Sequence, residues 1–156
     1  MPRFATPIVL GPGEGREIDL GNFAMVVKAT GADSGGSFSL LEAAEPPNFG
    51  PPIHVHQDCA EAFYVLEGEY RIFIEGEEHR CPAGSFVLIP SGLQHGFRVG
   101  EVPSRKLNLY APAEMIGYFD DLSEAMALGD ADPRKLDDIA QRHGMEVVGP
   151  VPEGYL

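Results

Sequence analysis

Apolar residues occur in short, strand-sized runs along the first two thirds of the chain, and glycine or proline closes nearly every run. These runs predict strands at residues 23–28, 37–41, 61–67, 70–75, 85–89, 95–99 and 105–110. Side chains alternate between the two faces of a strand, so Glu61, Phe63 and Val65 are expected to share one face. Many short strands separated by turns predict an all-β domain.

The pattern changes after Pro112. Apolar residues recur at helical spacing between Met115 and Met126. A second helix is expected to begin after Asp132, an N-cap residue followed by proline, and to end near His143. A short strand at residues 145–148 follows. We therefore expect a β domain over residues 1–112 and a helical extension over residues 113–156, packed on it within the same domain.

The composition narrows the class of partner. A chain of 156 residues with 44% hydrophobic residues suits one globular domain. Its formal net charge of −13 opposes binding to nucleic acid or to an anionic membrane, so a small molecule is the expected partner. Met1–Phe4 lacks the basic-then-apolar order of a signal peptide, and no apolar run reaches membrane-spanning length. The expected location is the cytoplasm.

The candidate chemistry begins with His54-Val55-His56, because two imidazoles two residues apart point to the same side of a strand. Such a pair is a weak signal alone. Glu61 follows after four residues, at the start of the next predicted strand, and Gly68 supplies the turn that ends that strand. Gly92 lies in the turn that closes the predicted strand at 85–89, and His95 follows three residues later.

These residues together resemble the two motifs of the cupin superfamily. The spacing is His54-x-His56-x4-Glu61-x6-Gly68, then fifteen residues, then Gly84-x5-Pro90-x-Gly92-x2-His95. The resemblance implies a double-stranded β-helix, a jelly-roll cupin barrel, with the helical extension as a short C-terminal appendage. It also implies one metal ion bound by His54, His56, Glu61 and His95.

The sequence departs from the family pattern at two positions. Asn48 stands where the family usually has glycine, and Val99 stands where its second motif usually ends in asparagine. Neither position is a ligand. Val99 is expected to make the pocket drier.

Three imidazoles and one carboxylate suit a divalent transition metal, and Fe, Mn, Ni, Co, Cu and Zn all remain open. Four protein ligands leave one or two positions for substrate or dioxygen. A structural metal is less expected, because structural sites are usually closed and rich in thiolate. The substrate pocket is expected to be apolar, with a lining drawn from Phe63, Val65, Phe73, Leu88, Phe97 and Val99.

Other candidate residues are assigned simpler roles. His79 lies in a charged hairpin and is expected at the surface, whereas His143 is expected to end a helix. Cys59 and Cys81 are expected to be free thiols, with Cys59 a small apolar filler. Tyr64 and Tyr110 are expected on the outer face or at the rim.

Pro51–Gln57, Glu61–Gly68 and the C-terminal segment 132–150 resemble single-domain proteins related to quercetin 2,3-dioxygenase. That resemblance implies a metal-dependent dioxygenase in which Glu61, as the catalytic base, accepts the proton of an enol or flavonol hydroxyl. Two alternatives stay open. One is an oxygen-independent isomerase, decarboxylase or cyclase that uses the same ion and base, and the other is a non-catalytic small-molecule-binding cupin. A homodimer is also expected, with residues 8–10 either exchanged between subunits or completing the local sheet.

Overall fold

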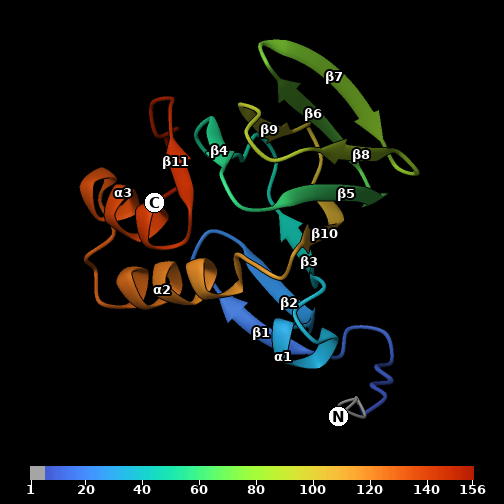
Figure 1. Ribbon diagram of the computed structural model, residues 1–156. Coiled ribbons are helices and arrows are strands. Elements are labelled where there is room, and N and C mark those ends of the chain that lie inside the picture. Colours follow the sequence, from blue (N-terminus) through green and yellow to red (C-terminus); the bar gives the residue numbers. More distant parts are fainter. Residues whose placement is uncertain (1–5) are drawn as a thin grey trace.

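The computed structural model describes residues 6–156, which form two facing antiparallel β-sheets with three helices (Figure 1). The expectation made for Met1–Phe4 lies outside the described residues. In the first sheet the strand order is β1-β2-β3-β10-β5-β8, with the bounds Arg16–Asp19, Ala24–Ala29, Ser39–Glu45, Ser104–Ala111, Ala60–Glu67 and Phe86–Ile89. In the second sheet the order is β11-β4-β9-β6-β7, with the bounds Met145–Val147, His54–His56, His95–Val99, Glu69–Ile74 and Glu77–Pro82. The helices are α1 (Gly31–Ser34), α2 (Ile116–Ala127) and α3 (Pro133–Arg142).

The space between the sheets holds the core, and the strands supply it by alternation. In β5 the side chains of Glu61, Phe63 and Val65 are all buried, which confirms the predicted shared face. Strand β10 lies between β3 and β5 and buries every second residue from Ser104 to Tyr110. This arrangement confirms the all-β jelly-roll class.

Two turn positions show how the chain closes these strands. Gly68 has a φ of 75°, and a Cβ atom there would lie 2.1 Å from the Ser104 hydroxyl oxygen, so no larger residue fits. Asn48 has a φ of 62°, in the left-handed region that asparagine tolerates better than most residues. The replacement of the usual glycine by Asn48 is therefore compatible with the same turn geometry.

The C-terminal segment adds a strand to the second sheet. Helix α3 begins as predicted, with the Asp132 carboxylate accepting a hydrogen bond from the backbone N–H of Lys135. Strand β11 then pairs antiparallel with β4, so that Met145 lies opposite His56. Figure 1 shows α2 and α3 on the side of the molecule where β11 lies. The helical segment thus helps to fix the strand that carries the two histidines.

Some elements differ from the predictions. Strands β1 and β7 were not expected, because their residues are mostly polar and exposed; in β7 only Cys81 is buried. Residues 8–10 lie outside any strand and are exposed, so the prediction that they complete the local sheet is wrong. None of the helices within residues 6–156 has the length and apolar character needed to cross a membrane.

Candidate metal centre

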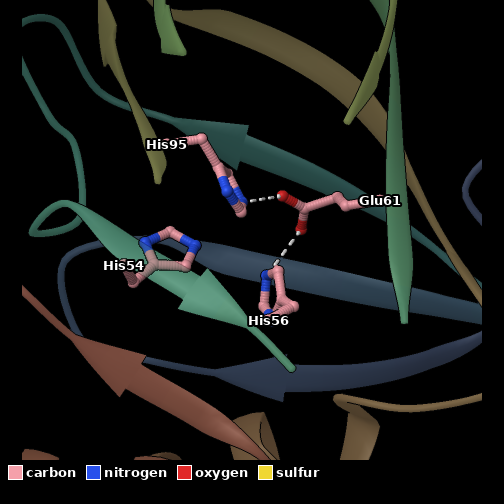
Figure 2. A group of neighbouring side chains, drawn as sticks. All are labelled: His54, His56, Glu61 and His95. Carbon is pink, nitrogen blue, oxygen red and sulfur yellow. Dashed lines mark hydrogen bonds and ion pairs between the residues drawn. The ribbon is translucent and has the colours of Figure 1, made fainter. Parts of the chain in front are cut away.

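Four side chains from three strands meet inside the barrel (Figure 2). His54 and His56 come from β4, Glu61 from β5 and His95 from β9. One nitrogen or oxygen atom of each lies within 4.8 Å of those of the other three, and all four residues are buried. Strand pairing contributes to this meeting, since His54 lies directly opposite His95 in the sheet.

Backbone carbonyl groups fix the orientation of two of the imidazole rings. Nδ1 of His54 lies 2.8 Å from the carbonyl oxygen of Pro52, and Nδ1 of His95 lies 2.9 Å from that of Leu93. Because a carbonyl oxygen can only accept, each Nδ1 carries the proton and donates it. Each Nε2 is then left for the centre of the cluster, which is the usual arrangement around a metal-binding histidine.

The Glu61 carboxylate lies between the imidazoles of His56 and His95. Its Oε1 atom is 3.0 Å from Nε2 of His95, and its Oε2 atom is 3.6 Å from Nε2 of His56. Both ring nitrogens of His56 are buried, and neither has a hydrogen-bond partner among the residues that the structure describes. Buried polar atoms without a partner are rare and point to a missing ion or water. A divalent cation bound to Nε2 of His56 would satisfy one of these two nitrogens, so the residues fit a metal ion.

The electrostatics of the cluster also suit a cation. Burial, together with the nearby His95 and His56 rings, lowers the pKa of His54 to about 3, so this ring is neutral. Burial opposes ionisation of Glu61. The nearby His56 ring and a hydrogen bond from His95 nevertheless hold the pKa of the Glu61 carboxyl well below its usual value. A neutral imidazole and an ionised carboxylate are the forms that bind metals.

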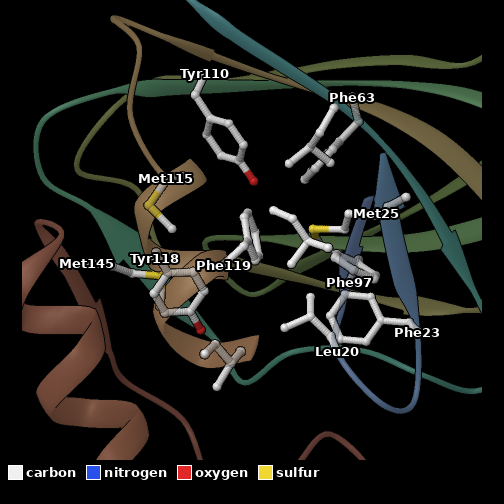
Figure 3. Packing of buried hydrophobic residues seen from close by; sticks show 14 of the residues in the cluster. Leu20, Phe23, Met25, Phe63, Phe97, Tyr110, Met115, Tyr118, Phe119 and Met145 are labelled. Atoms are coloured by element: carbon white, nitrogen blue, oxygen red, sulfur yellow. The ribbon is translucent and has the colours of Figure 1, made fainter. Parts of the chain in front are cut away.

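A cavity of about 40 Å³ is lined in part by His54, His56 and Glu61. A single buried water needs about 10–15 Å³, so the cavity has room for only a few water-sized groups. Figure 3 shows part of the apolar packing around it, with Tyr110 and residues of α2 close together. The cavity is lined by His54, His56, Glu61, Phe97, Tyr110, Asn108, Lys106, Glu45, Met25, Phe23, Phe49, Pro51, Pro52, Met115, Tyr118, Phe119, Met145 and Tyr155.

Of the six residues predicted to line a pocket, only Phe97 lies in the wall of this cavity. Phe63, Val65 and Val99 are buried in the core instead. The prediction is wrong for Leu88, which is 58% exposed because β8 turns Ile89 inward and its neighbour outward. It is also wrong for Phe73, which is only partly buried, because β6 turns Tyr70 and Ile72 inward.

The sequence analysis missed the polar residues of the cavity wall. Tyr110, expected on the outer face or at the rim, is 1% exposed and lies beside Glu61 in the strand pairing. Lys106 and Asn108 precede it on the same inward face of β10. The alternation of β10 was visible in the sequence. Hydrophobicity alone, however, favours the opposite assignment, with Leu107 and Leu109 inside.

The remaining candidates lie where they were expected. His79 is half exposed, and His143 caps α3, where its Nε2 atom lies 2.7 Å from the Asp121 carboxylate. Cys59 and Cys81 are both free and buried. Burial and nearby carboxylates raise the pKa of the Cys59 thiol to about 12, and Cys59 is not one of the four residues that gather at the centre.

Comparisons with known proteins agree with this geometry. The profile of the cupin domain matches residues 42–108. Quercetin 2,3-dioxygenase of Bacillus subtilis is 29% identical over 99 residues, which cover 64% of this chain and 29% of that protein. The polyketide synthase protein CurC of Streptomyces cyaneus is 33% identical over 81 residues, which cover 49% of this chain and 51% of that protein. The matched segment therefore spans 29% of the length of quercetin 2,3-dioxygenase and 51% of the length of CurC.

Among solved structures, KdgF from a Halomonas species superposes with a TM-score of 0.62 at 19% identity, covering 69% of this chain and 94% of that one. This likeness concerns the fold. Together with the two-sheet barrel and the buried His/Glu cluster, the comparisons support a protein of the cupin superfamily. In sequence, the chain is similar to quercetin 2,3-dioxygenase over 99 residues.

Proposed function

We propose that this cupin is a metal-dependent dioxygenase that cleaves a small enolic or aromatic molecule with O2. The observation that carries the proposal is the ionised Glu61 carboxylate, which lies among three imidazoles at the wall of a mostly apolar cavity. The similarity to quercetin 2,3-dioxygenase supports the choice of reaction class. An ion in this cluster supplies Lewis acidity, which lowers the pKa of a hydroxyl group bound to it.

The protein residues supply the acid–base chemistry. Glu61 is ionised and buried, so it can accept the proton that leaves a substrate hydroxyl. Burial and the Glu61 carboxylate raise the pKa of the Tyr110 hydroxyl well above its usual value, so that hydroxyl keeps its proton. The aromatic and methionine side chains around the cavity exclude water from the reacting group.

A second candidate, an isomerase, decarboxylase or cyclase that needs no oxygen, is favoured by Tyr110 itself. A protonated hydroxyl beside an ionised carboxylate provides a hydrogen-bond donor and a base on one wall, which suits the enolisation of a substrate carbonyl. Oxidative ring cleavage needs the base but makes less use of such a donor. The two reactions differ in their demand for O2.

The test is oxygen uptake by protein loaded in turn with Fe²⁺, Mn²⁺, Co²⁺ or Ni²⁺, using a panel of small enols, catechols and a flavonol. We expect uptake only with metal, and its loss in Glu61→Gln. His79→Gln is the matched control, since His79 is half exposed and distant in the fold from the cluster. Uptake that survives metal removal would reject the proposal. Turnover under argon would instead support the oxygen-independent reaction, and tight binding without turnover would support a binding protein.

We also propose a homodimer formed through the outer face of the first sheet. Tyr64 on β5 lies opposite Phe86 on β8, and both point outward, with exposed fractions of 45% and 65%. Leu88 extends the same face and is 58% exposed. Apolar residues gathered on one sheet face are typical of an interface, and a second copy of this chain is the proposed partner. The high negative charge makes nucleic acids and anionic membranes poor partners. A solution mass equal to the 16.8 kDa monomer would exclude the dimer.

A further inference from the structure

The inward face of β10 carries a row of three polar side chains along the cavity wall, namely Lys106, Asn108 and Tyr110. Successive members of the row are two residues apart, so they lie about 7 Å from each other along the strand. Tyr110 is next to Glu61 in the strand pairing, and Asn108 lies one step farther from the metal ligands, opposite Phe63. The row thus leads from the metal centre into the apolar part of the barrel.

Asn108 is the member of the row with unused hydrogen-bonding capacity. It is 3% exposed, and its side-chain N–H group donates to the Tyr110 hydroxyl oxygen at 3.3 Å. Its Oδ1 atom is fully buried and accepts no hydrogen bond from any residue that the structure describes. An unpaired buried acceptor destabilises the protein, because it has lost its hydrogen bonds to water without replacing them. A ligand that donates to this atom would remove this destabilisation.

Lys106, in contrast, already has a carboxylate partner and aromatic neighbours. Its ammonium group is 2.7 Å from Oε1 of Glu45 and lies over the rings of Phe97, Phe63 and Tyr70 at 4.2, 5.1 and 5.2 Å from their centroids. The same Glu45 oxygen accepts a hydrogen bond from the Tyr70 hydroxyl at 2.9 Å. The Lys106–Glu45 pair is neutral overall, so it leaves this end of the described cavity wall without an excess positive charge for an anionic group.

We propose that Asn108 is a substrate-binding residue, whose Oδ1 atom accepts a hydrogen bond from a second, neutral hydroxyl group of a molecule bound at the metal centre. The ligand class is a flat hydroxy-carbonyl or polyhydroxy-aromatic compound. One of its oxygens faces the metal ligands, and a further hydroxyl points along β10. A distal carboxylate or phosphate is disfavoured, because Asn108 Oδ1 would repel it and Lys106 is neutralised. The inference rests on the proposed function only in placing the ligand at the metal.

The cavity wall is flexible enough to accept a ligand of this size. The cavity of about 40 Å³ is too small for a rigid two-ring molecule. Three of its lining residues, however, are Met25, Met115 and Met145. Methionine side chains are unbranched and change rotamer readily, so they can make room for one ring.

The experiment measures binding without turnover, using Co²⁺-loaded protein under argon and the visible absorption of the bound Co²⁺. The probes form two matched pairs that differ by one hydroxyl, namely catechol with pyrogallol and allomaltol with kojic acid. We expect the native protein to bind the extra-hydroxyl member of at least one pair about 3- to 10-fold more tightly, as one net hydrogen bond allows. In Asn108→Leu and Asn108→Ala that ratio falls to about one, while the affinity for the simpler member changes less than about 2-fold.

The control is Leu107→Ala, which alters the same strand on its outward face and should keep the native ratio. The Co²⁺ spectrum shows whether each variant retains an intact centre. If both Asn108 variants lose the intact centre, the native protein alone provides the test. Its preference for the probe with the extra hydroxyl then supports the proposal. No preference in either pair, or a preference that survives removal of the Asn108 amide, overturns the proposal. An Asn108-dependent preference without oxygen uptake would uphold this inference and reject the dioxygenase.

Discussion

Lys106 and Glu45 form an ion pair at the wall of the cavity, and its replacement allows a quantitative test of the fold. Both residues are buried, Lys106 being 0% and Glu45 4% exposed, with 2.7 Å between the ammonium nitrogen and the carboxylate oxygen. Removing one partner of such a pair leaves an uncompensated buried charge, which costs about 3–5 kcal/mol. We therefore expect Lys106→Met alone to lower the free energy of unfolding by about that amount.

The double variant Glu45→Gln/Lys106→Met should recover most of the loss. The glutamine introduced in place of Glu45 keeps an oxygen that accepts from the Tyr70 hydroxyl. The methionine introduced in place of Lys106 fills the space of the lysine stem beside Phe97. Replacing both charges at once is often close to neutral, so the double variant should lie within about 1 kcal/mol of the native protein.

Urea unfolding at pH 7 measures these differences. With a slope of about 2 kcal/mol per molar urea, Lys106→Met should move the midpoint down by about 1.5–2.5 M. Arg80→Met is the control, because its ion pair with Glu69 is at the surface and its loss should leave the midpoint unchanged. The reasoning is refuted if Lys106→Met shifts the midpoint by less than about 0.5 M, or if the double variant is no more stable than Lys106→Met alone.

Three further predictions concern the metal centre and its neighbour Cys59. His56→Ala should weaken Co²⁺ binding at least about 100-fold, whereas His79→Ala should not, and equal affinities in a titration would remove His56 from the ligand set. Although burial lowers the pKa of His95, the hydrogen bond and charge of Glu61 raise it more, so the net pKa lies above 6.5. Since an entering ion must displace that proton, Co²⁺ affinity should increase about tenfold per pH unit below this pKa and level off above it; an affinity independent of pH between 5.5 and 8 would contradict this. Because the pKa of Cys59 is raised from 9.0 to about 12, its thiol should react with a disulfide reagent at pH 8 at least about 100-fold more slowly in folded than in urea-unfolded protein. Equal rates would show that the thiol is accessible.

The residues of the metal centre were predictable because their chemistry and spacing are local. His54 and His56 share a face through the period of a strand, and Gly68 and Gly92 mark the turns that bring Glu61 and His95 to the same region. The resemblance to the cupin motifs then indicated that His95 joins the other three residues, although it is far from them in the sequence. Helices α2 and α3 followed from helical spacing and from the Asp132-Pro133 cap.

The cavity wall could not be predicted in the same way, because its lining depends on which face of each strand turns inward. In β8 every residue is hydrophobic, so the sequence does not distinguish Leu88 from Ile89. In β6 the charged Glu69 and Arg71 share a face with Phe73, so the alternation favours Ile72 inside, and the prediction for Phe73 overlooked this pattern. In β10 the sequence favours the wrong face. Lys106 is inside because Glu45, 61 residues earlier in the chain, offers it a partner, and Asn108 on the same face donates to the Tyr110 hydroxyl of its own strand.

The sequence by itself therefore predicted the layout of a barrel followed by helices through local spacing, and it predicted the four candidate metal ligands through its resemblance to the cupin motifs. Only the tertiary structure decided what surrounds the ligands. It places Tyr110 beside Glu61, neutralises Lys106 with Glu45 and leaves one oxygen of Asn108 without a partner among the described residues. The physical reason is that a buried charge such as that of Lys106 needs an opposite charge beside it, and its partner Glu45 is 61 residues away in the sequence.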